Sequence, residues 1–395
     1  MSQIPAHLGE LNDEWLTHAL RSSGLISSSN AVTSHTASRV GEGAGFLGDL
    51  ARVELSYASA EDGAPASMIA KFPTATPENR GFGMMLGAYE NEIRFYDELA
   101  GQMPVSVPVC YFGALDPEAR SSAIVSKVLG WLPSAVTLKL LDRLTLAAGK
   151  SDRRFGLLIE DLGDRRVGDQ AAGCDREEAE LALRALAAMH ATFWESPVLE
   201  REWVQRADDQ PGMVHGLFKR AWPVYEERFR SLLTPEVRER TDFVAEHGPR
   251  LLRRMGRPPL TLAHGDYRLD NLMFDDDGDA TEVTMIDFQG VTAANPMIDV
   301  AYFLLPNVRA EVAAEHADAL LLSYHTALVA AGVGNYSWAQ CQEDYVLAQL
   351  WLVHRGVILI GTLDLSHERG VELVDHAVER SLPAVVSIDL ASVRI

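Results

Sequence analysis

The sequence predicts an α+β fold with two lobes: an N-terminal lobe built from an antiparallel sheet and a helix, and a mostly helical C-terminal lobe. Between residues 31 and 72 apolar and polar residues alternate, which is typical of half-buried strands, and a turn at residues 61–65 separates two of them. After Gly163 most apolar residues recur at helical spacing. The exception is the stretch 260–288, where two apolar runs flank an aspartate-rich turn.

The other elements of the N-terminal lobe follow from the same two periodicities. An amphipathic helix is predicted over residues 7–25, with Gly24 placed to end it. Further along the chain we expect a helix, a strand, a helix and a strand, over residues 84–100, 105–111, 134–150 and 155–159. A chain of 395 residues is long enough for two lobes, each with its own core.

The charge of the chain is strongly acidic. Its 35 basic and 56 acidic side chains give a formal net charge of -21. A surface of this charge repels a phosphate backbone, so nucleic acid is not expected as a partner, and cationic or neutral substrates fit better. The same charge is also typical of a solubility adaptation, which indicates nothing about a particular pocket.

The cysteines and the apolar stretches indicate the compartment. Three cysteines far apart in the sequence predict neither a disulfide framework nor a zinc site, which favours a reducing cytoplasm. The first twenty residues contain too many charged residues for a secretory signal. The apolar stretch 346–363 is interrupted by His354 and Arg355, so we expect a core helix there and no membrane span.

A glycine-rich segment at residues 41–48 contains the pattern GxGxxG, beginning at Gly43 and Gly45. In a dinucleotide site these glycines would open a helix, but the residues that follow alternate as in a strand. A flexible hairpin over a triphosphate therefore fits better than a dinucleotide fingerprint. An ordinary glycine-rich turn remains an alternative.

Lys71 is one of five lysines, and it lies in the apolar run 68–72. A lysine on an apolar strand needs a carboxylate or a phosphate to offset its desolvation. Glu92, on the next predicted helix, is the expected partner, with Glu90 as the alternative. A site for nucleotide phosphates requires a strand lysine that is held by a helix glutamate. The alternative is an edge-strand lysine in solvent, which would need neither a carboxylate nor a phosphate as its partner.

The most specific pattern runs from His264 to Asn271 and on to Asp287. It places Asp266 five residues before Asn271, followed by an apolar strand, a turn and a second strand that ends at Asp287. Phosphoryl transfer needs a carboxylate that orients the attacking hydroxyl and oxygen ligands for magnesium, and this hairpin supplies all three groups.

In this order the motifs resemble the aminoglycoside phosphotransferase and choline kinase superfamily, which has a protein-kinase-like fold. The motifs are most similar to those of the ecdysteroid-kinase-like branch. Five short segments carry the resemblance, at residues 43–48, 92–96, 159–162, 189–194 and 286–289. The resemblance implies an N-terminal lobe at residues 1–159 with an extra helical insert at about 118–153. A hinge at 160–163 and a C-terminal catalytic and substrate-binding lobe at 164–395 would follow. The insert is a departure from the family pattern.

The resemblance also implies roles for individual residues, with ATP and Mg2+ as cofactors. Asp266 would be the catalytic base, and Asn271 and Asp287 the magnesium ligands. The nucleotide would be bound by the following residues, the last two through their main chain: Gly43, Gly45, Lys71, Glu92, Glu160 and Leu162.

Four further residues attract attention, and each has a structural explanation. We expect Asp299 to cap the catalytic loop by accepting backbone hydrogen bonds, and His264 to buttress that loop. His190 and Trp194 lie four residues apart on one helix face, which favours core packing over ligand contact.

The expected function is transfer of the ATP γ-phosphate to a hydroxyl group of a small-molecule alcohol. A protein kinase is disfavoured because only residues 288–298 separate Asp287 from Asp299 and no APE motif follows. A catalytically silent, nucleotide-binding pseudokinase or scaffold is the alternative, and an oxidoreductase is a distant third. The sequence identifies neither the acceptor nor the oligomeric state.

Overall fold

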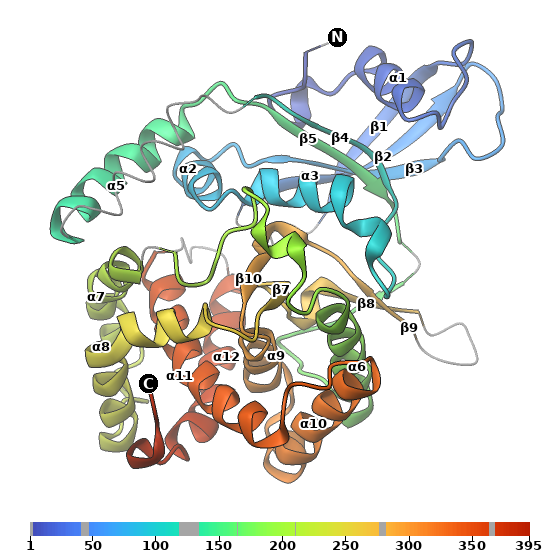
Figure 1. The fold of residues 1–395 in the computed structure, drawn as a ribbon. Helices are drawn as coiled ribbons and strands as arrows, with labels where there is room; N and C mark the ends of the chain where they lie inside the picture. Colours follow the sequence, from blue (N-terminus) through green and yellow to red (C-terminus); the bar gives the residue numbers. More distant parts are fainter. Residues whose placement is uncertain are drawn as a thin grey trace. The chain divides into compact units, whose positions relative to one another are not determined.

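The computed structural model describes residues 3–40, 47–117, 134–163, 165–209, 211–275, 282–362 and 368–395. The chain divides into two compact units (Figure 1). The first comprises Met1–Gly101, Val107–Leu129 and Lys139–Asp164, and the second comprises Gln102–Ser106, Gly130–Leu138 and Arg165–Ile395. An antiparallel sheet dominates the first unit and helices dominate the second, which confirms the predicted fold class.

The sheet of the first unit has five antiparallel strands. Their order is β1 (Val32–Arg39), β2 (Gly48–Tyr57), β3 (Ser67–Pro73), β5 (Phe155–Glu160) and β4 (Cys110–Leu115). The predicted start of the strand at residues 105–111 is therefore wrong, because β4 begins at Cys110. Pro108, just before it, has no N–H group to donate to a neighbouring strand.

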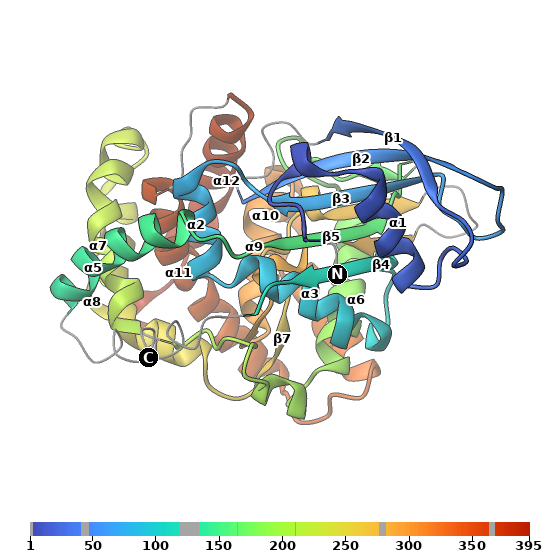
Figure 2. The ribbon, with the colours of Figure 1, turned by 90° about the horizontal axis from the view of Figure 1, so that it is seen from above.

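Helix α1 (Asp13–Ser22) covers one face of this sheet (Figures 1 and 2). Trp15, fully buried, packs with its ring centroid 6.1 Å from that of Phe72. The helix begins later than predicted because Asn12 caps it, accepting a hydrogen bond of 2.9 Å from the N–H of Trp15. The preceding residues form only a short 3-10 helix, η1 (Leu8–Glu10).

Two helices replace the single helix predicted at residues 84–100. They are α2 (Pro77–Met85) and α3 (Ala88–Glu98), and Gly87 separates them with a left-handed backbone (φ 67°) that glycine adopts without strain. The predicted helix at 134–150 is present as α5 (Ser134–Gly149). Residues 118–133 of the predicted insert lie outside the described part of the chain.

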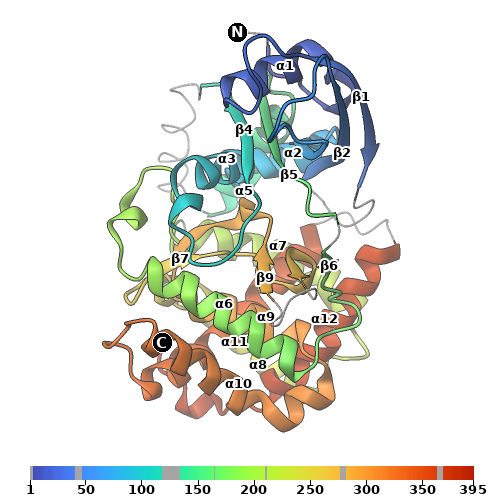
Figure 3. The same ribbon diagram turned by 90° about the vertical axis from the view of Figure 1, so that its right-hand side faces the viewer.

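The second unit contains seven helices in its described part (Figure 3). They are α6 (Arg176–Thr192), α7 (Pro211–Arg228), α8 (Pro235–Met255), α9 (Met297–Asn307), α10 (Ala310–Ala330), α11 (Trp338–Thr362) and α12 (Glu368–Val386). Helix α9 is the centre of the core, since ten of its residues are buried, and it packs against α11 and α12. None of the helices described here has the length and apolar character needed to cross a membrane.

Two small sheets lie among these helices. One pairs β10 (Thr292–Ala294) with β7 (Thr261–Ala263). The other has the order β6 (Arg166–Val167), β8 (Leu272–Asp275) and β9 (Glu282–Met285). Strands β8 and β9 form the predicted hairpin, and their register pairs Leu272 with Met285, so the residues just outside this pair come close together.

Candidate active site

Lys71 and Glu92 form a buried ion pair within the first unit. The Nζ atom of Lys71 lies 2.9 Å from Oε1 and 2.7 Å from Oε2 of Glu92, and only 8% and 3% of the two side chains are exposed. In β3 the residues on either side of Lys71, Ala70 and Phe72, face the α1 core. Lys71 therefore points to the opposite face of the sheet, where α3 supplies the glutamate.

Glu90 has different partners. Its carboxylate lies 2.7 Å from Nε of Arg94, one turn along α3, and 2.8 Å from a terminal nitrogen of Arg153. Residues two apart on a helix point in different directions, so Glu90 and Glu92 cannot both face β3. Of the two candidate carboxylates, Glu92 is the partner of Lys71.

The end of β5 carries the predicted hinge residues. The N–H of Glu160 donates to the carbonyl oxygen of Val109 at 2.8 Å, and the Glu160 carboxylate accepts a hydrogen bond of 3.0 Å from the N–H of Val109. The amide of Glu160 is therefore occupied within the sheet, while Leu162 lies just beyond the strand. Gly43 and Gly45 lie outside the described residues.

The loop of Asp266 follows β7 in the second unit. Gly265 has φ +76°, and a Cβ atom there would come within 1.9 Å of the carbonyl oxygen of Gly290. Only glycine fits this position, both for its backbone angle and for the space. The tight turn leaves Asp266 at the start of the loop with 29% of its side chain exposed.

Three side chains hold the carboxylate of Asp266. The hydroxyl of Tyr302 donates to Oδ1 at 2.8 Å, and Nδ2 of Asn271 and Nε of Arg268 donate to Oδ2 at 2.9 and 3.2 Å. Burial alone would raise the pKa of Asp266. The guanidinium groups of Arg268 and Arg355 and the Tyr302 hydrogen bond outweigh burial and lower the pKa to about 2.

Asn271 and Asp287 are brought together by the hairpin. The carbonyl oxygen of Asn271 accepts a 3.0 Å hydrogen bond from the N–H of Ile286, directly before Asp287. The side-chain nitrogen of Asn271 donates both to the carbonyl oxygen and to the carboxylate of Asp266, each at 2.9 Å. This arrangement turns the amide nitrogen toward Asp266, and the amide oxygen points away from it.

Asp287 has an unusual backbone for a residue with a side chain. Its φ of 65° and ψ of 68° lie in the left-handed region. Such a conformation costs about 1–3 kcal/mol and is found mainly where a side chain must point in a required direction. In the described part of the chain no group of three or more His, Cys, Asp or Glu residues is arranged to hold a metal ion. Any metal at Asn271 and Asp287 would therefore need ligands from a bound molecule or from water.

Asp299 anchors the loop from behind. Its Oδ2 accepts a 2.6 Å hydrogen bond from the N–H of His264, and its Oδ1 accepts one of 2.9 Å from the N–H of Gly265. The prediction that Asp299 caps this loop is confirmed. Nε2 of the fully buried His190 lies 3.2 Å from the same carboxylate, and the Nδ1 atom lies 2.7 Å from the hydroxyl of Tyr324. His190 is thus a core residue, as expected.

His264 buttresses the other side of the loop. Its Nε2 lies 3.0 Å from the carbonyl oxygen of Ile286, and the ring is fully buried against Phe288 with the centroids 4.9 Å apart. The ring therefore links the loop of Asp266 to the strand end that carries Asp287, in agreement with the expected buttressing role. Trp194 packs against Tyr336, with ring centroids 5.2 Å apart.

Sequence reasoning missed three residues around Asp266: Arg268, Tyr302 and Arg355. Burial and the neighbouring Asp266 raise the pKa of Tyr302, so it stays protonated and donates. A terminal nitrogen of Arg355, on α11, lies 3.9 Å from Oδ1 of Asp266. In the sequence, Arg355 stands out only as a charged residue within an apolar helical stretch, a pattern that argues against a membrane span but does not indicate a site.

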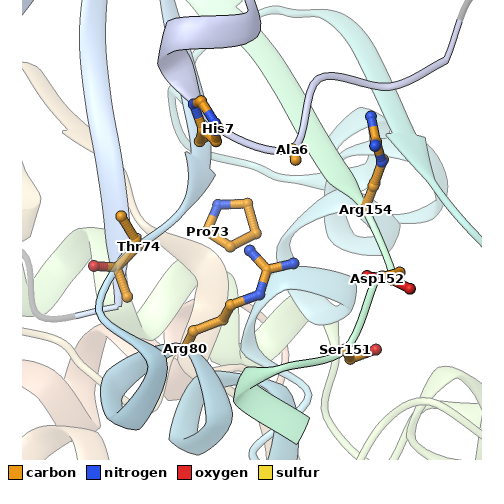
Figure 4. Close-up of a pocket in the computed structure, with 9 residues that line it drawn as sticks. Ala6, His7, Pro73, Thr74, Arg80, Ser151, Asp152 and Arg154 are labelled. Carbon is orange, nitrogen blue, oxygen red and sulfur yellow. The ribbon is translucent and has the colours of Figure 1, made fainter.

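A cavity of about 240 Å3 in the first unit contains none of the predicted site residues (Figure 4). It is lined by Ala6, His7, Pro73, Thr74, Ala75, Arg80, Ser151, Asp152 and Arg154. Arg80 reaches toward Pro73 and donates a 2.8 Å hydrogen bond to the carbonyl oxygen of Arg153. The predicted chemistry does not lie in this cavity.

The segment that contains Asp266, Asn271 and Asp287 is similar to a known protein family. A model of the ecdysteroid kinase-like family matches residues 144–332. This stretch of the chain is similar to the ecdysteroid kinase-like family. It contains all three residues and confirms the resemblance drawn from the motifs. No curated protein sequence is similar enough to the chain to count as a match.

Solved structures show the same fold at low sequence identity. A choline kinase from Cryptosporidium parvum has a TM-score of 0.52 at 9% identity, covering 94% of this chain and 96% of its own. An aminoglycoside 2'-phosphotransferase mutant in its GDP complex has a TM-score of 0.51 at 15% identity, covering 95% and 100%. An amicoumacin kinase in complex with AMP-PNP and Ca2+ has a TM-score of 0.51 at 13% identity, covering 91% and 92%. The matched stretch thus lies within a kinase-like fold that extends over most of the chain.

Proposed function

We propose that the protein is an ATP- and Mg2+-dependent kinase that phosphorylates a hydroxyl group of a small-molecule alcohol. One observation carries this proposal above the others. The hairpin brings Asn271 and Asp287 to the loop of Asp266, and Asn271 is hydrogen-bonded to the Asp266 carboxylate at 2.9 Å. A carboxylate next to an amide and a second carboxylate is the set of groups that phosphoryl transfer uses.

The residues present fit magnesium as a cofactor. Mg2+ prefers oxygen ligands and is usually held by one or two protein side chains, with phosphate and water oxygens completing the shell. The amide oxygen of Asn271, turned away from Asp266, and the carboxylate of Asp287 would be those two ligands. When bound, the ion would neutralise charge on the phosphate oxygens during transfer.

We assign to Asp266 the role of orienting the acceptor. The acceptor oxygen forms a bond to the γ-phosphorus, the bond from that phosphorus to the β,γ-bridging oxygen breaks, ADP leaves with the electron pair, and the hydroxyl proton passes to Asp266. With a pKa of about 2, Asp266 is ionised at neutral pH but is a weak base. Its main contribution is therefore to accept the hydrogen bond of the hydroxyl and direct the oxygen, while proton transfer follows bond formation.

We assign the nucleotide to residues of the first unit. The ammonium group of Lys71, held by Glu92 at 2.7 Å, would contact the α- and β-phosphates. Glu160 and Leu162 would offer main-chain groups to adenine. The N–H of Glu160 already donates a hydrogen bond to the carbonyl oxygen of Val109. The Glu160 carbonyl group and the main chain of Leu162 would therefore make the adenine contacts at this strand end. Gly43 and Gly45 are proposed to lie over the phosphates.

The test is ATP consumption in the presence of Mg2+ and a panel of alcohols. We expect Asp266→Ala to lower turnover by roughly 10² to 10⁴, because the hydroxyl loses both its orienting hydrogen bond and its proton acceptor, and to leave the affinity for ATP nearly unchanged. Asp375→Ala is the matched control, because Asp375 is 43% exposed and pairs with Arg228 on the surface. Equal turnover in the Asp266 variant and the wild type would refute the assignment.

The same experiment separates the proposal from a catalytically silent scaffold. A pseudokinase would bind ATP but consume none of it with any acceptor. A protein kinase is disfavoured by the short path after Asp287, which contains only η5 (Phe288–Gly290) and β10 before α9 begins at Met297.

A further inference from the structure

Arg355 is held in a fixed position beside Asp266. Its guanidinium carbon lies 5.0 Å from the centroid of the Tyr302 ring and 5.6 Å from that of the Trp351 ring, one turn earlier on α11. Stacking on two aromatic rings fixes the plane of a guanidinium group. Tyr302 in turn is fixed by its hydrogen bond to Asp266. The position of Arg355 is therefore tied to that of the carboxylate.

Arg355 makes no short hydrogen bond to a carboxylate of the described residues. Its nearest carboxylate oxygen among the described residues is Oδ1 of Asp266 at 3.9 Å, which exceeds hydrogen-bond distance. Its Nε atom is buried without a hydrogen-bond partner, yet 28% of the side chain is exposed. The exposed part of the group, beside Asp266, therefore has its donors available to a ligand.

The neighbouring arginine is different. Nη1 of Arg268 lies 2.7 Å from the carboxylate of Asp270, and its Nε donates to Asp266. Only 14% of the Arg268 side chain is exposed. Arg268 is thus part of the loop itself, and Arg355 is the cation that faces outward.

An acceptor hydroxyl that reaches Asp266 must come within a few ångströms of Arg355. A cationic group close to that hydroxyl would be repelled, whereas a carboxylate or a phosphate would bind the guanidinium group through charge-assisted hydrogen bonds. We propose that Arg355, stacked on Tyr302 and Trp351, binds an acidic group of the acceptor, so that the substrate is an alcohol carrying a carboxylate or a phosphate near its hydroxyl. This inference rests on the proposed function.

The inference reverses an expectation from composition. A net charge of -21 favours cationic or neutral substrates, but it describes the whole chain. Beside Asp266, the partly exposed guanidinium group of Arg355 presents a positive charge that attracts an anion. The local group decides the acceptor, because electrostatic interactions weaken over about 10 Å in salt.

The test compares acceptors with and without an acidic group. Phosphoryl transfer from ATP is measured with hydroxy carboxylic acids of several chain lengths, each paired with its methyl ester, and with glycerol phosphate paired with glycerol. We expect the wild type to prefer the acidic member of a pair. Arg355→Gln should lower kcat/KM for the acid roughly 10- to 100-fold more than for the ester, and the difference between the two should lie mainly in KM. Arg355→Lys should recover part of the loss.

Two further measurements make the outcome decisive. Arg238→Gln, which removes the same charge from a surface pair with Glu226, should behave as the wild type. An equal loss of kcat for acid and ester in Arg355→Gln would mean that Arg355 acts on the phosphoryl group, which would overturn the proposal. So would a wild-type preference for esters, aminoglycosides or choline.

Failure of the proposed function gives a different result. If no alcohol is phosphorylated while ATP still binds, the kinase assignment fails and the anion site is tested by binding alone. A hydroxy acid should then raise the melting temperature of the wild type more than its ester does, and Arg355→Gln should remove the difference. Equal protection by acid and ester, or protection that survives Arg355→Gln, overturns the inference.

Discussion

The substitution Glu92→Gln tests the ion pair of the first unit, because it keeps the shape of the side chain and removes its charge. Lys71 then retains a buried ammonium group with 8% of its side chain exposed and no countercharge from Glu92. At about 2.8 Å and an effective dielectric constant near 20, the lost attraction is roughly 6 kcal/mol. A hydrogen bond to the new amide oxygen returns about 1 kcal/mol, so we expect a loss of about 3–5 kcal/mol in the free energy of unfolding.

The measurement is urea-induced unfolding of the wild type, the single variant and the double variant Lys71→Met/Glu92→Leu. The double variant removes both charges and leaves no buried charge unpaired, so it should recover most of the lost stability. It should also lose affinity for ATP, since the proposed phosphate contact is gone. Glu98→Gln on the same helix is the control: its partner Arg94 is 36% exposed, and the expected loss is below about 1 kcal/mol.

Two results would contradict this reasoning. A loss of less than 1 kcal/mol in Glu92→Gln would mean that the pair is well solvated. A double variant as unstable as the single variant would mean that packing, and not charge, explains the loss.

Three other substitutions test the second unit. Asp287→Ala should abolish Mg2+-dependent binding of ATP in calorimetric titrations; equal affinity with Mg2+ and with EDTA in the wild type would argue against a metal ligand. Tyr302→Phe should raise the pKa of Asp266 above its value of about 2. A lowered carboxylate pKa stabilises the fold above about pH 4, and this contribution disappears as the pH falls toward 2. The difference in the free energy of unfolding between wild type and variant, measured by urea unfolding, should therefore disappear over that pH range. Gly265→Ala should cost more than about 2 kcal/mol, because its Cβ would lie 1.9 Å from the carbonyl oxygen of Gly290, and unchanged stability would show that the loop can shift.

The sequence predicted those parts of the site that depend on local spacing. Asp266 and Asn271 share one loop, and a short hairpin returns Asp287 to it, so five residues and a turn determine their proximity. The sequence also favoured Glu92 over Glu90 as the partner of Lys71, but only the direction of α3 relative to β3 excludes Glu90. That direction is set by packing in the first unit, which no local pattern reveals.

Other parts depend on contacts between distant segments. Arg355 and Tyr302 reach Asp266 from α11 and α9, 89 and 36 residues along the chain. A periodic apolar pattern predicts each helix, but it does not predict which turn of the helix faces the loop. The sequence shows an arginine within an apolar stretch, but it does not show that this arginine lies beside Asp266.

The errors in element boundaries came from capping and breaking residues. Helical spacing alone extended the first helix back to residue 7, whereas Asn12 starts it by capping the N–H of Trp15. The same spacing continued through Gly87, where the left-handed backbone separates α2 from α3. Apolar periodicity therefore locates elements more reliably than it locates their ends.

The hydrogen bonds of Asp299 have a consequence for how this protein can change over time. Asp299 holds the backbone of His264 and Gly265 from within the core, together with His190. The loop of Asp266 is thus held from the core side. Substitutions at residues of α11 such as Trp351 and Arg355 would change the surroundings of the Asp266 carboxylate but leave this backbone anchor in place, so the chain can vary there without losing the loop.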